Sequence, residues 1–315
     1  MGFERLLGNE RLKENLRKSI LRGRSSHFYL ISGPVGSGKK TLAQLLAAAL
    51  QCRSEEKPCG NCTACRKVFS NAHPDVITVT DPEHKNVAVR IVRQIRDDMF
   101  VRPNEGNKKI YVFPQELGIE GQNALLKVLE EPPSYGVFIL LSENPEQLLP
   151  TVRSRCTELS LKSLDRMQML PVLKREFPEA AEQDLQAAVF RSGGYLGQAI
   201  QILQEGGALP PETQSFAKAY AEKDALGLTV LLAPLEKWKR DQLQQTLSQW
   251  AGLLQQALLC RSGMPAVTPL ARELAAKRSS QDLNRAIACL NKADVYLRAN
   301  VSPGAVCGWL SWALR

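Results

Sequence analysis

Residues 33–41 read GPVGSGKKT and constrain the fold more than any other part of the chain. They lie between the apolar run at residues 27–31 and a stretch rich in Ala and Leu that is typical of a packed helix. A Gly-rich turn between a strand and a helix is the context of a phosphate-binding loop, in which backbone N–H groups surround the phosphates. The candidate nucleotide-binding residues are therefore Gly33, Gly36, Gly38, Lys39 and Thr41.

The same loop departs from the phosphate-binding pattern where a magnesium ligand is needed. A Ser or Thr directly after the lysine binds Mg²⁺, but this chain has Lys40, and the hydroxyl of Thr41 comes one residue later. That is a rotation of about 100° around the helix. After residues 109–113, where ATPases carry carboxylates, the chain has Pro114, Gln115 and Glu116. Because phosphoryl transfer depends on metal and positioning, we expect little ATP hydrolysis. Binding of ATP or ADP by the remnant loop stays open.

Short apolar segments alternate with helical patterns over residues 1–163, and this alternation predicts an α/β domain with a parallel sheet. Beyond residue 163 the pattern is helical throughout, and a linker rich in Gly and Pro is predicted at residues 206–211. The predicted strands are 27–31, 75–79, 109–113, 136–141 and 157–161, and the predicted helices between them include 3–22, 41–52, 87–100 and 122–131.

Four of the eight cysteines lie within fourteen positions, which indicates a metal site. Structural zinc is tetrahedral and takes four thiolates, and with all four positions filled no site is open for a catalytic water. Pro58, Gly60 and Asn61 supply tight turns between the ligands. Reduced core or surface cysteines are the alternative, with redox sensing a minor third. The candidate ligands are Cys52, Cys59, Cys62 and Cys65.

Composition narrows the class of protein. With 44% hydrophobic residues the chain can bury a core, so disorder of the whole chain is excluded. No apolar run approaches the roughly 18 residues of a membrane span, and the N-terminus lacks the apolar segment of a secretory signal. We expect a cytoplasmic protein with no membrane partner. The net charge of +9 suits a nucleic-acid neighbour, although charge says little until its placement is known.

Several segments, taken in order, resemble bacterial DNA polymerase III clamp-loader subunits over roughly residues 1–163. They are LGNERLKENLRKSI, HFYLISGPVGSGKKTLAQLLAAAL, the four cysteines, GQNALLKVLEEPP and LLPTVRSRC. The resemblance implies an AAA+ domain over 1–163 with a four-cysteine zinc module at 52–65, a helical lid over 164–207 and an oligomerising helical collar over 208–315. It also implies a ring with gamma/tau and delta subunits that loads the sliding clamp on primed-template DNA.

Departures from the family pattern favour one branch of it. Gamma/tau motors hydrolyse ATP, whereas the related delta-prime subunit has a defective site. A delta-prime-like stator is indicated by Lys40, by the segment 114–116 and by Gly197 at the place of a sensor arginine. We also expect no tail of the tau type. Two alternatives stay open. One is an active gamma/tau-type ATPase with Glu116 as its catalytic carboxylate, and the other is a zinc-stabilised DNA-binding adaptor outside replication.

One catalytic part of the family is kept. Residues 154–156 match its Ser-Arg-Cys motif, which implies that Arg155 is an arginine finger acting in trans on ATP bound by a neighbouring subunit. Arg153 is a possible substitute, and a plain surface arginine is the alternative. Asn144 follows the fourth strand near the place of a sensor residue. Basic residues that would face DNA, or simply solvent, are Arg90, Arg93, Arg96, Arg102, Lys108 and Lys109.

Overall fold

The computed structural model describes residues 2–205, 209–263 and 268–314. The chain divides into two compact units, residues 1–169 with 195–198, and residues 170–194 with 199–315. The predicted linker begins at residues 206–208, which lie outside the described residues. The three-domain division at residues 163 and 207 stays a prediction.

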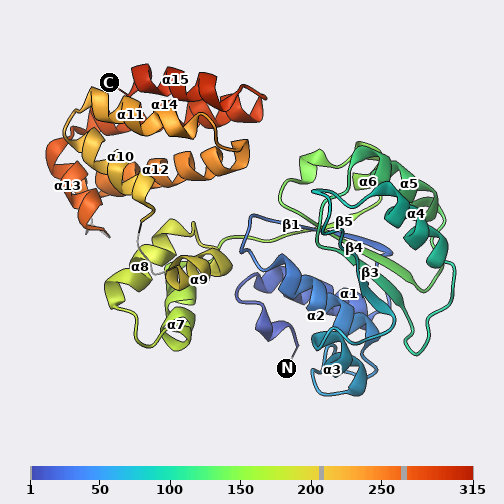
Figure 1. The fold of residues 1–315 in the computed structure, drawn as a ribbon. Coiled ribbons are helices and arrows are strands. Elements are labelled where there is room, and N and C mark those ends of the chain that lie inside the picture. The colour runs from blue at the N-terminus through green and yellow to red at the C-terminus, as the bar shows by residue number, and fades with distance from the viewer. Residues whose placement is uncertain (1, 206–208, 264–267, 315) are drawn as a thin grey trace. The chain divides into compact units, whose positions relative to one another are not determined.

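The first unit is built on a parallel sheet with the strand order β2-β3-β4-β1-β5 (Figure 1). All five predicted strands form, with bounds within a residue or so of the predicted ones. Among the described residues no strand follows β5, so the predicted fold class is confirmed. The strands are β1 (Phe28–Ser32), β2 (Val76–Thr78), β3 (Lys109–Phe113), β4 (Gly136–Ser142) and β5 (Thr157–Ser160).

Helices lie on both faces of this sheet, and the central strands feed both cores. Along β1, Tyr29 and Ile31 join the core under α1, α2 and α3, while Phe28 and Leu30 join the core under α4, α5 and α6. This alternation follows from the two-residue period of a strand. The helices are α1 (Glu10–Leu21), α2 (Lys39–Gln51), α3 (Thr63–Phe69), α4 (Val89–Asp98), α5 (Ile119–Glu130) and α6 (Pro150–Arg153), with short 3-10 helices at Phe3–Arg5 and Pro145–Gln147.

Three predicted helices differ from the observed ones. The continuous helix expected over residues 3–22 is wrong, because Gly8 and Asn9 adopt left-handed backbone angles (φ 63° and 55°) that interrupt it. The helix expected from residue 87 begins at Val89, since Val87 instead forms a parallel bridge with Leu117. Helix α5 starts three residues before its predicted first turn.

The second unit is helical throughout its described part. Its largest core surrounds Trp250, whose ring stacks on Phe216 with centroids 4.2 Å apart. No described helix of the protein is long and apolar enough to span a membrane. The remaining helices are α7 (Arg166–Glu176), α8 (Glu182–Arg191), α9 (Leu196–Gln204), α10 (Pro211–Ala221), α11 (Ala225–Leu235), α12 (Arg240–Arg261), α13 (Pro269–Lys277), α14 (Ser280–Arg298) and α15 (Pro303–Ala313). Of these, α7 and α9 begin within the first unit.

Candidate nucleotide loop, metal module and arginine

The Gly-rich loop lies at the carboxyl edge of the sheet, where β1 pairs with β4. The amide of Gly33 donates a hydrogen bond to the carbonyl oxygen of Ser142 at 3.2 Å, which closes this edge. The connection after β1 runs over one face of the sheet and those flanking β4 run over the other (Figure 1). Open α/β sheets bind ligands at such a reversal. The fold therefore presents the loop where a nucleotide site belongs.

The loop is covered by the short segment 195–198, which belongs to the same unit. The amide of Gly197 donates to the carbonyl oxygen of Gly36 at 2.9 Å. Gly36 has φ 74°, and a Cβ there would lie 2.3 Å from the backbone nitrogen of Gln198. A Cβ on Gly197 would in turn lie 2.7 Å from the Cα of Gly36. Backbone packs on backbone here, so in this arrangement position 197 admits only glycine.

Lys39 and Ser37 place two polar donors at the loop. The Lys39 ammonium donates to the carbonyl oxygens of Gly33 and Pro34, the latter at 2.9 Å. Burial lowers the pKa of Lys39, while the charges of Glu143 and Glu116 oppose that shift. The Ser37 hydroxyl is buried and has no hydrogen-bond partner among the described residues, so an anion oxygen would satisfy it. These donors fit a phosphate group, although Lys39 must first leave its carbonyl partners.

The structure places the two positions at which a phosphate-binding loop needs a magnesium ligand. Lys40 is exposed in the first turn of α2, and Thr41 is half-buried beside it. After β3, the Gln115 side chain is used entirely by the preceding loop. Its Oε1 accepts from the Asp81 amide at 2.8 Å, and its Nε2 donates to the carbonyl oxygens of Asp81 and Lys85 at 3.1 and 2.7 Å. Gln115 thus stabilises the loop at residues 81–85, a structural role that sequence reasoning missed.

Glu116 and Asn144 also lie at the carboxyl edge of the sheet. The Glu116 carboxylate accepts from the hydroxyl of Ser142, the last residue of β4, at 3.4 Å. The charge of Glu116 opposes the lowering of the Lys39 pKa, which indicates that the carboxylate lies near the loop. The Asn144 side-chain oxygen accepts from the Glu146 amide at 3.1 Å and caps the 3-10 helix that follows. The Asn144 oxygen therefore has a local structural partner.

The four clustered cysteines converge on one point. Their sulfur atoms all lie within 4.8 Å of one another, and the Cys59–Cys65 and Cys52–Cys62 sulfurs are each 4.0 Å apart. A tetrahedral zinc with bonds of about 2.3 Å separates its sulfur ligands by roughly 3.8 Å, so the cluster fits this ion. All eight cysteines are free, and no disulfide competes for these sulfurs.

Backbone amides of the module support thiolate rather than thiol sulfur. Each of three amides donates to the sulfur of the preceding ligand, Cys59 to Cys52 at 3.5 Å, Cys62 to Cys59 at 3.4 Å and Cys65 to Cys62 at 3.4 Å. The Ser54 hydroxyl, followed by backbone amides, lowers the pKa of Cys59 to about 6. Burial raises the pKa of Cys65 instead. Such N–H donors orient metal ligands and stabilise their charge.

Arg155 lies in the turn between α6 and β5 and is partly exposed (37% of its side chain). Its guanidinium contacts one carboxylate, Glu130 at 3.0 Å, and the carbonyl oxygen of Thr151 at 2.8 Å. Arg153 is held by two carboxylates, Glu146 at 2.7 Å and Glu158 at 3.2 Å. Reaching a neighbouring molecule would therefore cost Arg155 one exposed ion pair and one hydrogen bond to a carbonyl oxygen, and exposed ion pairs contribute little.

One of the predicted DNA-facing residues is wrong. Lys109 is buried, and its ammonium contacts the Asp98 carboxylate at 2.9 Å and the carbonyl oxygens of Asp98 and Val101 at 2.7 and 3.3 Å. A buried charge needs such partners, so Lys109 does not face DNA. Lys108 donates to the carbonyl oxygen of Ser134 at 2.8 Å. Of the six predicted residues, Arg96 pairs with the neighbouring Asp97, and Arg90, Arg93 and Arg102 are exposed to solvent.

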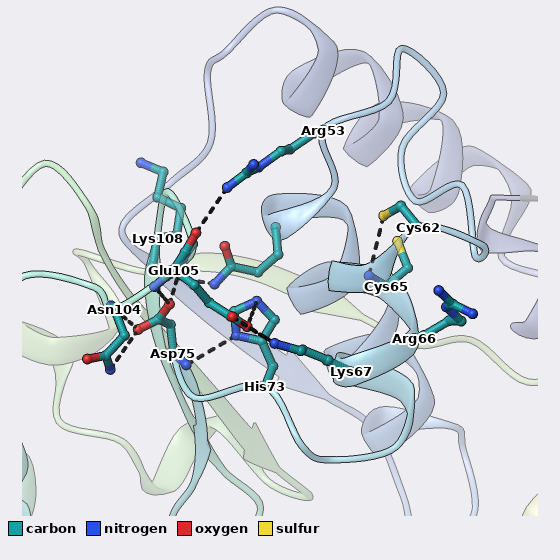
Figure 2. A network of polar contacts seen from close by, with 12 residues as sticks. Arg53, Cys62, Cys65, Arg66, Lys67, His73, Asp75, Asn104, Glu105 and Lys108 are labelled. Atoms are coloured by element: carbon teal, nitrogen blue, oxygen red, sulfur yellow. Dashed lines mark hydrogen bonds and ion pairs between the residues drawn. The ribbon is translucent and has the colours of Figure 1, made fainter.

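A polar network beside the cysteine module was missed altogether (Figure 2). The Asp75 carboxylate is buried and accepts from the amides of Asn104, Glu105 and Gly106 at 2.5, 2.9 and 2.7 Å. Sequence reasoning treated Asp75 only as the first residue of a strand. Its partners lie about thirty positions away, and no local pattern signals them.

Comparisons with known proteins give the family. The family described as "DNA polymerase III, delta subunit" matches residues 8–165. The delta' subunit of Yersinia pestis is 32% identical over 253 residues, which cover 76% of this chain and 72% of that protein. The chain belongs to the delta'-like subunits of the DNA polymerase III clamp loader. Within this family, the delta' subunit of Pseudomonas aeruginosa is 36% identical over 180 residues, covering 55% of this chain and 54% of that protein.

Proteins named as tau or gamma-related subunits are similar as well. The tau subunit of Bacillus subtilis is 31% identical over 211 residues, which cover 64% of this chain but 37% of that longer protein. Among solved structures, a gamma subunit-related protein from Thermotoga maritima aligns over 96% of this chain and 99% of its own, with 17% identity and a TM-score of 0.44.

Proposed function

We propose that this chain is a delta-prime-like stator of the bacterial replicative clamp loader. It completes a ring with gamma/tau and delta subunits in the cytoplasm, and the ring loads the sliding clamp on primed-template DNA. The chain hydrolyses little or no ATP itself and supplies Arg155 in trans to ATP bound by a neighbouring motor subunit.

The observation that carries the proposal is that the Gln115 side chain is occupied by hydrogen bonds to a neighbouring loop. At the end of β3 its amide is fully engaged with residues 81–85, where a motor needs a carboxylate near magnesium. Lys40 occupies the other metal position, and a cation does not ligate a cation. Without metal, the charge that builds up on the transferred phosphoryl group is not neutralised. The cover of Gly36 by Gly197 supports the same reading.

A gamma/tau-type ATPase is the second candidate, favoured by the position of Glu116 near Lys39. Steady-state ATPase of the isolated chain with Mg²⁺ separates the two. We expect no turnover above that of Lys39→Ala. Turnover that is lost in both Lys39→Ala and Glu116→Gln, but kept in the exposed control Glu120→Gln, would establish the motor reading instead.

The trans role of Arg155 is tested in the assembled loader. Arg155→Ala should slow ATP turnover by about tenfold or more, because each ~1.4 kcal/mol of lost transition-state stabilisation is a factor of ten. Arg153→Ala serves as the matched control, since its guanidinium is committed to two carboxylates. If Arg153→Ala slows turnover while Arg155→Ala does not, the role moves to Arg153.

We also propose that Cys52, Cys59, Cys62 and Cys65 hold one structural zinc ion. Four sulfur ligands leave no position for water, so the ion would fix the turns of the module and take no part in chemistry. Elemental analysis should find one zinc per chain. Cys59→Ser and Cys62→Ser should lower that content, while the isolated Cys260→Ser should not. Zinc-free protein with a normal fold would rule the site out.

A further inference from the structure

We propose that the metal module fixes the conformation of residues 104–108 through Glu105, so that metal occupancy controls the order of this loop. The inference rests on the metal site proposed above, but it assigns the module a role that the metal site alone does not imply. Figure 2 shows the contacts that connect the two regions.

One side of the loop is held by Asp75, which lies outside the metal module. The Asp75 carboxylate accepts three successive amides, those of Asn104, Glu105 and Gly106. Asp75 is itself part of the sheet edge, because its carbonyl oxygen accepts from the Ile110 amide at 2.8 Å. These contacts give the loop its backbone path, but they leave its outer side without support.

The outer side of the loop at residues 104–108 is held by Gln51 and Arg53, the residues on either side of Cys52. Gln51 donates from Nε2 to the carbonyl oxygen of Lys108 at 2.7 Å, and its side chain fills the space beside Gly106, where a Cβ would lie 2.4 Å from Gln51 Oε1. Arg53 donates to the carbonyl oxygen of Glu105 at 3.0 Å. The loop therefore rests on the two side chains that flank a metal ligand.

Helix α3 supplies the third contact. Its N-cap is Cys62, whose sulfur accepts from the Cys65 amide, so the start of the helix carries two of the proposed ligands. Two residues after Cys65, the Lys67 ammonium contacts both carboxylate oxygens of Glu105 at 2.7 Å. Glu105 thus receives one contact from each end of the module, Arg53 on its carbonyl and Lys67 on its carboxylate.

The physical reason for coupling is that the module has little order of its own. Helix α3 spans seven residues, and isolated helices shorter than about 12 residues are marginal in water. Residues 53–61 form no helix or strand. Metal binding fixes four points of this stretch and so places Arg53 and Lys67 opposite Glu105. By linkage, an ordered loop must then strengthen metal binding by the same factor.

Hydrogen exchange on the full-length chain tests the first direction. After removal of metal with a chelator, amides 104–108 should exchange about tenfold faster or more, which corresponds to ~1.4 kcal/mol. Peptides from α12 in the second unit serve as the internal reference and should not change. If residues 52–69 lose protection while 104–108 keep theirs, the coupling is overturned. If elemental analysis finds no metal in the chain, the metal site proposed above is ruled out together with the coupling. The two failures can therefore be told apart.

Metal affinity tests the reverse direction without unfolding the module. In Glu105→Gln, zinc should bind about fivefold more weakly or worse, measured by competition with a chromophoric chelator, since coupling of this kind typically spans 5- to 150-fold. Glu14→Gln is the matched control, because it breaks the exposed Glu14–Lys18 pair (2.6 Å) on α1 and touches neither region. Equal zinc affinity in the two variants would overturn the proposal.

Discussion

Single residues of this chain act through partners that lie far away in the sequence. Asp75 holds residues 104–106, Gln115 holds residues 81–85, and Lys109 binds Asp98 under the end of α4. Asp75 and Lys109 are buried and Gln115 is half-buried, so removing any of these side chains leaves polar groups without their partners. The structure around the Gly-rich loop therefore depends on such long-range contacts.

Asp75→Asn should destabilise the first unit by about 2 kcal/mol at neutral pH, because charge-assisted hydrogen bonds contribute ~1.5–3 kcal/mol. Burial alone would raise the pKa of Asp75, but the three amide donors outweigh burial and hold the pKa below its usual value. The contribution is therefore present above about pH 4 and lost as pH falls through the lowered folded-state pKa.

Urea unfolding followed by far-ultraviolet circular dichroism measures this difference. The difference in the free energy of unfolding between wild type and Asp75→Asn should become smaller in acid. A gap of equal size at neutral and acid pH would show that the Asp75 charge does not matter.

Gly36→Ala should be more destabilising than Gly23→Ala. Both glycines have left-handed backbone angles (φ 74° and 66°), so each alanine costs about 1–2 kcal/mol of backbone strain. A Cβ at Gly23 meets nothing within 4 Å, whereas at Gly36 it collides with the backbone of Gln198. Thermal unfolding of the two variants isolates the second cost. Equal melting temperatures would mean that segment 195–198 does not pack on the loop in solution.

At the scale of elements, the strands are easier to predict than the helices. A buried parallel strand is a short apolar run between turns, and this pattern located all five strands. Helix ends depend on single backbone choices, such as the left-handed Gly8 and Asn9 that separate the first 3-10 helix from α1. In the second unit, apolar residues distributed over α10 to α15 meet around Trp250.

Trp250→Ala should destabilise the second unit by about 3–5 kcal/mol, the usual cost of deleting a buried aromatic side chain. Its side chain is fully buried and stacks on Phe216. Trp312 is 70% exposed, so Trp312→Ala is the matched control and should change stability by less than about 0.5 kcal/mol. Chemical denaturation compares the two. Similar losses in both variants would contradict the assigned core.

At the scale of the whole molecule, the two units have separate cores and separate probes. All four tryptophans, at 238, 250, 309 and 312, belong to the second unit, and the cysteine module belongs to the first. Fluorescence from tryptophan therefore reports on the second unit, while circular dichroism reports on both.

Chelation of metal should lower the unfolding temperature of the first unit and leave the second unchanged. We expect the tryptophan fluorescence transition to stay in place while part of the circular dichroism transition moves down, because structural zinc contributes directly to folding. A fluorescence transition that shifts together with circular dichroism would mean that the chain unfolds as one cooperative unit.

The sequence by itself determined the parallel sheet, the helical second half, the family and the cysteine cluster. These features depend on patterns within a few residues, such as apolar runs, the Cys-x2-Cys spacing and the Gly-rich turn, and local sterics and ligand geometry act over that range. Only the tertiary structure decided that Lys109 is buried and that the Gln115 side chain bonds the loop at residues 81–85. It also decided that Gly197 packs on Gly36, and that Glu105 contacts residues of the cysteine module. Those contacts join residues that are 11 to about 160 positions apart, and the chain brings them together only when its apolar faces are buried.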